Sequence, residues 1–446
     1  MTTYEELTFL LDEKRYIDFI NAISEMNAVD TADFLMTIDI HQLPKVFRML
    51  KKDVAADIFA ELDSDLQQRI IEAMQDSEIS KFIDLLAIDD TVDMLEELPA
   101  NVVNKILKST SLQQRNEINR FLKYPESSAG SVMTSEFICI KSDITVSEAV
   151  AYIRKTGIDK ETVYVIYVTD KSRRLLGIIE LKDLLFANDD DLISDLMDSA
   201  IISATTSDDR ETVADTISKY DLLALPIVDS ENRLVGIVTV DDALDVINDE
   251  ATEDIEKMVA IVPSDKPYLK IGIFETWLKR IPWLLVLMLS ATFTGSIITH
   301  FESALSQVVI LTAFIPMLMG SGGNAGGQSS VTIIRSLSLG EIRMGNIFRI
   351  LWKEFRVSVL CGITLSVAAF AKIMLIDRTS VSVALVVSLT LLATVIVAKL
   401  VGASLPILAK RVGLDPAVMA SPFITTVVDA VSLFIYFSIA TSILKL

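Results

Sequence analysis

An aspartate lies about mid-way along a strongly apolar stretch near the end of the chain. Asp429 belongs to TTVVDAVSLFIYF and has no basic residue near it in sequence. An ionised carboxylate at the centre of a bilayer costs about 2.5 to 3.5 kcal/mol on insertion scales, so such a residue usually faces a cavity or a cation. We therefore expect Asp429 on a hydrated wall. The structural alternative is a salt bridge to Lys372 or Lys399 of other apolar stretches.

Two threonines could extend this hydrated wall. Thr425 and Thr426 precede Asp429 by about one helical turn and would add hydroxyl groups to the same face. The alternative is that they make hydrogen bonds between neighbouring helices, as threonines do in membranes.

A glycine-rich segment is the second chemical signal. Residues 316–330, PMLMGSGGNAGGQSS, lie in a run without charge from 303 to 334. Glycine weakens helices, so its clustering at membrane depth suggests backbone facing protein or a watery path. Asn324 and Gln328 are four residues apart and could share one side, beside opened carbonyls. Such oxygen ligands suit hard cations, whereas the alternative interpretation is close helix packing through small residues.

Five apolar stretches surround these residues and are long enough to span a bilayer of about 30 Å. We expect spans at 281–301, 304–334, about 357–376, 381–406 and about 417–444. The positive-inside rule places the N-terminus in the cytoplasm and the C-terminus outside. The basic residues that decide this are in the segments joining spans two to three and four to five: Arg335, Arg343, Arg349, Lys353, Arg356, Lys410 and Arg411.

The first half of the chain is acidic. The net charge of −21 is concentrated in the first 260 residues, which disfavours nucleic acid or anionic lipid as partners and suits cations. The two cysteines and two histidines are too few and too scattered for a disulfide framework or a zinc site. The N-terminal segment is acidic and amphipathic, so we expect no cleaved signal peptide.

Residues 1–129 have apolar residues at helical spacing in short segments, which predicts an all-α domain. The segments starting at Thr31 and Thr91 are similar to each other, which suggests an array of helical hairpins; a plain helical bundle is the alternative.

Residues 130–196 and 197–247 form a tandem repeat of short β-rich runs and helices. Aligning Gly177 with Gly236 also aligns Asp183 with Asp242. Each copy has an opening M-T or M-D, a helix, a β-hairpin ending in G-I-V or G-I-I, and a final acidic helix. This pattern resembles a CBS pair, a regulatory module that binds adenine nucleotides or ions in other proteins.

The pattern of residues 248–275 predicts a charged connector helix with breaks at Pro263 and Pro267, followed by a transmembrane domain at 276–446. The fold class is therefore a multidomain membrane protein: an α-helical N-terminal domain, an α/β CBS pair, a connector and five α-helical spans. The connector could equally be a rigid spacer.

Over its whole length the sequence resembles the MgtE family of magnesium channels and transporters. The specific features are P-x-L-x-G-S-G-G-N-x-G-x-Q-S in span two, and D-P-A followed fourteen residues after its Asp by the intramembrane Asp429. The resemblance implies a homodimer in the cell membrane. It also implies a pore on the two-fold axis, where the aspartates of both subunits surround a hydrated Mg²⁺.

Carried over by position, the resemblance assigns two groups of residues. Those of the ion path are Asp429, Thr425, Gly323, Asn324, Gly326, Gln328 and Ser421. Those that would sense cytosolic Mg²⁺ are Asp89, Asp93, Glu211, Asp221, Asp242, Asp245, Glu250, Glu253, Asp254 and Asp415, the last through a metal shared with the connector. Each of these acids could instead be a solvated surface charge.

The functional hypothesis is a Mg²⁺ channel or transporter that closes when cytosolic Mg²⁺ bridges acidic domain faces, with ATP as a candidate ligand of the CBS pair. Transport of Co²⁺, Ni²⁺ or Mn²⁺ is one alternative. An intramembrane aspartyl protease is another, but it needs two carboxylates and each chain offers one at mid-span. A CBS-gated receptor without conduction would leave Asp429 and the glycines unexplained. The charge pattern predicts no nucleic-acid partner.

Overall fold

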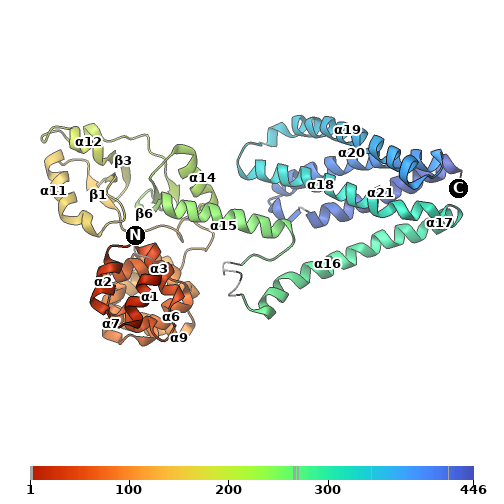
Figure 1. Ribbon diagram of the computed structural model, residues 1–446. Helices are drawn as coiled ribbons and strands as arrows, with labels where there is room; N and C mark the ends of the chain where they lie inside the picture. Colours follow the sequence, from red (N-terminus) through yellow and green to blue (C-terminus); the bar gives the residue numbers. More distant parts are fainter. Residues whose placement is uncertain (1–3, 265–267, 269–270, 343, 420, 446) are drawn as a thin grey trace. The chain divides into compact units, whose positions relative to one another are not determined.

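The computed structural model of the chain describes residues 4–264, 268, 271–342, 344–419 and 421–445. It divides into two compact units, Met1–Ile247 and Asn248–Leu446, each described by itself (Figure 1).

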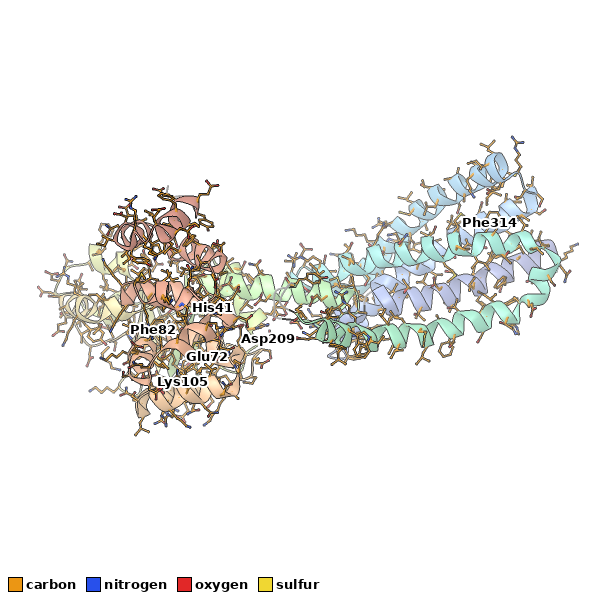
Figure 2. The ribbon with its side chains drawn as sticks, turned by 60° about the horizontal axis from the view of Figure 1, so that its bottom comes forward. His41, Glu72, Phe82, Lys105, Asp209 and Phe314 are labelled. Carbon is orange, nitrogen blue, oxygen red and sulfur yellow. The ribbon has the colours of Figure 1, made fainter. Side chains whose placement is uncertain are left out.

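The first unit begins with short helices. In the described residues these are α1 (Tyr4–Asp12), α2 (Tyr16–Ser24), α3 (Ala28–Thr37), α4 (Leu43–Phe47), α5 (Lys52–Ala60), α6 (Ser64–Ala73), α7 (Asp76–Ile83), α8 (Ile88–Glu97), α9 (Ala100–Ser109) and α10 (Leu112–Phe121). Their apolar faces close on one core, in which Phe82 packs edge-on against Phe59 with ring centroids 5.0 Å apart. Lys105 donates hydrogen bonds to the carbonyls of Ile71 and Met74, at 3.0 and 2.9 Å, where α6 ends (Figure 2).

The predicted tandem repeat is confirmed. The first copy contains β1 (Ile138–Lys141), α11 (Val146–Thr156), β2 (Val165–Thr169), β3 (Leu175–Glu180), α12 (Leu181–Phe186) and α13 (Ile193–Leu196). The second contains β4 (Ala204–Thr205), α14 (Arg210–Tyr220), β5 (Ala224–Val228), β6 (Leu234–Thr239) and the first half of α15 (Val240–Met258). Each copy forms a three-stranded sheet with one parallel and one antiparallel pair.

The two copies exchange their opening segments. A methyl group on Gly236 would lie 2.5 Å from the sulfur of Met133, and one on Gly177 would lie 2.8 Å from that of Met197. The amide of Thr134 donates to the carbonyl of Ile237 at 2.8 Å across this junction. The repeated glycines are therefore required because each copy completes the hairpin of the other.

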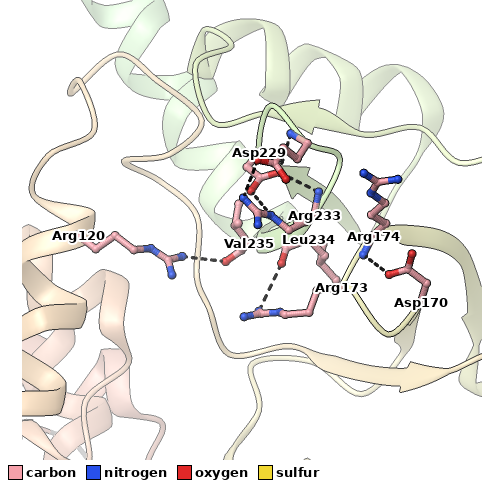
Figure 3. A network of polar contacts seen from close by, with 9 residues as sticks. Arg120, Asp170, Arg173, Arg174, Asp229, Arg233, Leu234 and Val235 are labelled. Atoms are coloured by element: carbon pink, nitrogen blue, oxygen red, sulfur yellow. Dashed lines mark hydrogen bonds and ion pairs between the residues drawn. The ribbon is translucent and has the colours of Figure 1, made fainter.

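Arginines tie the hairpins of the pair to each other and to the N-terminal helices (Figure 3). Arg173 of the first hairpin donates to the carbonyl of Leu234 at 3.4 Å. Arg120 of α10 donates to the carbonyl of Val235 at 3.3 Å. The N-terminal helices and the second copy also share an apolar core that includes Val92, so they form one unit.

The second unit contains, in its described residues, five helices long and apolar enough to cross a membrane. Its elements are the end of α15, α16 (Ile273–His300), α17 (Glu302–Gln307), a 3-10 turn (Val309–Phe314), α18 (Ile315–Ser338), α19 (Ile347–Lys372) with a π turn (Ile373–Asp377), α20 (Val381–Arg411) and α21 (Ser421–Leu444). Helix α20 is the most buried span, and α18, α19 and α21 pack on it. Figure 1 shows α16 along the side of this bundle.

Some expected boundaries shift. The first span begins at Ile273 rather than 281, and the second begins at Val309 because Ala304 belongs to the separate helix α17. The connector helix ends at Met258, well before 275. Two features explain why the helix ends at Met258. Ala260 has a positive φ of 60°, and Pro263 has no backbone N–H to donate to a continuing helix. Pro267 lies outside the described residues.

Candidate functional site

Helix α18 carries the glycine-rich segment without interruption, so the expected opened carbonyls are not found. The buried face of this helix approaches α20 and α21 closely instead. A methyl group on Gly402 of α20 would collide with the carbonyl oxygen of Gly326, and one on Gly326 would lie 2.7 Å from Ile424. Close packing through small residues, the alternative interpretation of the motif, therefore describes this face. Gly326 lies in the helix contact and not in the cavity described next.

The other face of α18 borders a cavity of about 400 Å³. This cavity brings together five of the predicted path residues. Its lining is Met319, Gly320, Gly323, Asn324, Gly327, Gln328, Thr425 and Asp429.

The register of two helices places these side chains. Asn324 and Gln328 are one turn apart on α18, and Thr425 and Asp429 are one turn apart on α21, so each helix presents two oxygen-bearing groups to one space. Carboxylate, amide and hydroxyl oxygens are the ligands that hard cations prefer, and the volume leaves room for water around an ion. The side chain of Ser421, also predicted here, lies outside the described residues.

The salt bridge that would give Asp429 a structural role is not observed in the described part of the chain. Lys372 pairs with Asp377, with Nζ 2.7 Å from Oδ2. Lys399 donates to the hydroxyl of Ser329 at 3.4 Å. Asp429 therefore faces its cavity without a basic partner among the described ion pairs.

A second group of acids gathers in the first unit. Burial, then the charge of Glu161, raises the pKa of Asp89 on α8 to about 6. Burial raises the pKa of Asp93 to about 7, with Asp89 adding to it, and that of Asp242 to about 6. One carboxylate oxygen of Asp89, Oδ1, is buried without a hydrogen-bond partner in the described structure. The structure thus concentrates negative charge where α8 meets the start of α15.

Three further acids belong to this group and were not predicted. Burial, and to a smaller extent the charges of Asp89 and Asp93, raise the pKa of Asp90 to about 7. Burial also raises the pKa of Glu136 to about 7 and raises that of Glu161. Asp90 adjoins Asp89 in sequence and could have been included on that ground. No local signal marks Glu136 or Glu161, because folding brings them to α8 from distant parts of the chain.

Four of the other predicted sensing acids lie on or at the end of α14 and along α15. Glu211 is in the first turn of α14, and Asp221 ends that helix in a left-handed conformation with φ of 53°. Asp245 and Glu250 lie along α15. No cluster of three or more His, Cys, Asp or Glu side chains in the described residues is arranged to hold a metal ion directly.

A lysine joins Asp415 to the end of α15. Nζ of Lys257 lies 2.7 Å from Oδ2 of Asp415 and also pairs with Glu253. Burial opposes the charged form of Lys257, but the hydrogen bonds and charges of these two carboxylates raise its pKa above the ordinary value. Asp254 accepts a hydrogen bond from Ser338 at 3.2 Å, and burial, then the charge of Asp415, raises its pKa. The predicted acids Glu253, Asp254 and Asp415 thus meet around Lys257.

Five helices long and apolar enough to cross a membrane, a CBS-like pair and a cavity lined by Asp429 indicate a multi-pass membrane protein of the cation-transporter class. Family profiles match at residues 315–439 (MgtE, divalent cation transporter), 26–127 (MgtE intracellular N domain), and 129–190 and 193–249 (CBS domain). The chain belongs to the MgtE family.

Relatives cover nearly the whole chain. It is 36% identical to magnesium transporter MgtE of Thermus thermophilus over 90% of this chain and 89% of that protein. It is 33% identical to magnesium transporter MgtE of Bacillus subtilis over 99% and 98% of the two chains. A crystal structure of the cytosolic domain of the Mg²⁺ channel MgtE in complex with ATP is 30% identical, with a TM-score of 0.52, over 55% of this chain and 100% of that one.

Proposed function

We propose that this chain moves Mg²⁺ across the cell membrane, along a path that includes the cavity at Asp429. The observation that carries the proposal is that α18 and α21 direct a carboxylate, a hydroxyl and two amides into one space. Mg²⁺ gives up its water reluctantly and is held through one or two carboxylates, which suits one aspartate from each chain in a site with room for water. The relatives in Thermus thermophilus and Bacillus subtilis are named magnesium transporters.

The lining of the described cavity offers carboxylate, hydroxyl and amide oxygens but no imidazole or thiolate, which favours Mg²⁺ over Co²⁺ and Ni²⁺. Mn²⁺ takes the same oxygen ligands as Mg²⁺, so only the experiment separates these two ions. Competition in a liposome flux assay tests this choice. Mg²⁺ influx should fall little when an equal concentration of Co²⁺, Ni²⁺ or Mn²⁺ is added. Transport of one of these ions in preference to Mg²⁺ would overturn the assignment of Mg²⁺ as the transported ion.

Asp429→Asn tests the path. The amide keeps the size of the side chain and removes its charge, so we expect Mg²⁺ flux into liposomes to fall at least about tenfold, since one charge in a site of low dielectric contributes more than about 1.4 kcal/mol to cation binding. The measurement is fluorescence of an entrapped Mg²⁺ indicator.

Asp377→Asn is the matched control. Asp377 also lies in the membrane unit but pairs with Lys372 near the end of α19, away from the lining of the cavity. Its flux should stay within about twofold of the parent protein, as expected for a partly exposed ion pair. Full flux in Asp429→Asn, with the control unchanged, would remove Asp429 from the path.

We also propose that cytosolic Mg²⁺ closes this path. The buried acids around Asp89 repel one another, and a cation among them would relieve that repulsion in the compact state. Because the described acids do not form a direct metal site, the ion would bind through its own water shell. The remaining assigned acids, Glu211, Asp221, Asp245, Glu250, Glu253, Asp254 and Asp415, are proposed contributors. Mg²⁺ regulates only if it binds the closed state more tightly than the open one.

A homodimer with cytoplasmic N-termini and external C-termini completes the proposal. Asn324 and Gln328 are exposed on the single chain, although amides facing lipid are costly. A second copy covering them supplies the missing wall and a second Asp429. Light scattering in detergent should give the mass of two chains, and a single-chain mass would contradict this arrangement.

ATP is proposed as a ligand of the CBS pair, whose two copies carry the aligned aspartates Asp183 and Asp242. The similar cytosolic domain was crystallised with ATP. Calorimetric titration of the full chain with ATP should release heat that saturates, and no heat would argue against binding.

A further inference from the structure

A second cavity, of about 650 Å³, lies in the membrane unit and contains a buried lysine. Lys399 on α20 is 5% exposed, and its ammonium group donates to the hydroxyl of Ser329 at 3.4 Å. That hydroxyl donates in turn to Oε2 of Glu354 at 2.6 Å. One charge of each sign, joined through a serine, therefore borders the same space. Its lining is Gly327, Gln328, Ser329, Val331, Thr332, Glu354, Val357 and Lys399.

This arrangement is too costly to be incidental. A lysine buried in the middle of a 31-residue span loses its hydration, and the loss is tolerated only when an opposite charge and hydrogen bonds compensate it. Three different helices contribute one member each: α18 the serine, α19 the glutamate and α20 the lysine. We call these three residues the Lys399 relay. Its net charge is zero, so neither charged member can change alone without leaving the other uncompensated.

The relay and the proposed cation path share a wall. Gly327 and Gln328 of α18 line both the 650 Å³ cavity and the 400 Å³ cavity of Asp429. Neither glycine nor glutamine carries a charge that could screen one side from the other. The relay thus acts on the path across one helix, a separation on the order of 10 Å.

We propose that the Lys399 relay sets the affinity of the cation path by fixing the electrostatic potential behind its α18 wall. The proposal rests on the proposed function, because it assumes that cations pass Asp429. The ammonium repels and the carboxylate attracts a cation on the other side of the wall, and their balance keeps binding weak enough for release. At this separation an uncompensated charge changes the occupancy of a divalent cation on the order of tenfold.

The test is a set of charge substitutions with flux measured against Mg²⁺ concentration. Lys399→Met leaves Glu354 uncompensated, so the half-saturating concentration should fall about tenfold. Glu354→Gln keeps a hydrogen-bond acceptor for Ser329 and leaves the ammonium uncompensated, so the half-saturating concentration should rise by a similar factor. The double variant removes both charges and should return to within about threefold of the parent.

Two controls separate charge from packing. Lys399→Arg retains the charge and should keep the parent half-saturating concentration. Lys372→Met makes the same chemical change at an exposed ion pair with Asp377 and should leave that concentration unchanged. If both single variants lower the maximal flux without moving the half-saturating concentration in opposite directions, the relay is structural only and the proposal is overturned. The proposal is also overturned if neither variant changes transport.

Failure of the relay is distinguishable from failure of the path. Loss of flux in Asp429→Asn, together with unmoved half-saturating concentrations in the Lys399 and Glu354 variants, overturns the relay alone. Full flux in Asp429→Asn overturns the path itself. Should Lys399→Met not be produced as a folded protein, Glu354→Gln and the double variant still decide the sign of the effect.

Discussion

At the scale of single residues, Lys257 lies among acids that the family resemblance assigns to the sensing of Mg²⁺. Asp415 was predicted to meet the connector through Mg²⁺, and in this structure its carboxylate also accepts a hydrogen bond from the ammonium of Lys257. Three carboxylates, those of Glu253, Asp254 and Asp415, lie near this one positive charge. The lysine therefore ties the end of α15 to Asp415, and we expect Mg²⁺ to strengthen this link.

Lys257→Met tests this role. Without the ammonium, the carboxylates repel one another and the end of α15 should open more often when Mg²⁺ is absent. We expect the amides of residues 250–258 to exchange hydrogen about tenfold faster in EDTA, which corresponds to about 1.4 kcal/mol of lost local stability. In millimolar Mg²⁺, the exchange rates of the variant should differ little from those of the parent. The amides of Lys257→Arg should exchange at the rate of the parent. If Lys257→Met and the parent exchange at the same rate in EDTA, Lys257 does not hold the end of α15.

At the scale of elements, α18 has two faces with different functions. Gly322 and Gly326 allow α20 and α21 to approach, whereas Asn324 and Gln328, on the other side, line the cavity. A helix with large residues on the packed face would be displaced from α21 and would separate Asp429 from the amides. The glycines thus shape the proposed path through helix packing rather than through exposed carbonyls.

Gly402→Ala tests this packing. The new methyl group would collide with the carbonyl oxygen of Gly326, a clash that only a backbone shift can relieve. We expect a loss of about 2 to 3 kcal/mol in stability, seen as a lower unfolding temperature in detergent and reduced flux. Gly295→Ala on α16 is the control, because nothing lies within 4 Å of the added methyl group. A stable, active Gly402→Ala protein would contradict the close approach of α18 and α20.

At the scale of the whole molecule, the acids of the first unit couple its folding to protons and cations. The pKa values of Asp90 and Asp93 lie near 7, and those of Asp89 and Asp242 near 6, above the ordinary 3.8. The folded state therefore binds protons more tightly than the unfolded state. The resulting stabilisation is present at low pH, diminishes as pH rises from about 4, and is lost once pH passes the folded values of 6 to 7.

The expected outcome is a first unit that is more stable in acid than in base when divalent cations are absent. In EDTA, its unfolding temperature should be about 5 °C higher at pH 5.5 than at pH 8. Millimolar Mg²⁺ at pH 8 should recover most of this difference. Calorimetry of the full chain measures both effects. The double variant Asp90→Asn, Asp93→Asn should show a smaller difference in unfolding temperature between pH 5.5 and pH 8. A parent protein that is less stable at pH 5.5 than at pH 8 would contradict the raised pKa values of these acids.

The sequence alone was sufficient for the order of elements. Apolar periodicity predicted the helices of the first 129 residues, repetition predicted two similar α/β copies, and hydropathy predicted five spans. These signals are local, because the apolar pattern of each element can be read from its own stretch of sequence. The ends of elements were less accurate, as at Met258 and Val309, because a helix end depends on caps and turns of few residues.

The sequence by itself thus determined the class of protein and predicted the residues of its cation path, since the family motifs and the mid-span position of Asp429 are visible without coordinates. Only the tertiary structure decided how α18 uses its glycines and which acids join Asp89. It also decided that Lys257 pairs with Asp415 and that Lys399 reaches Glu354 of α19 through Ser329 of α18. The reason is physical: these interactions join residues far apart in the chain. Their energies depend on burial and distance, which no local pattern of residues records.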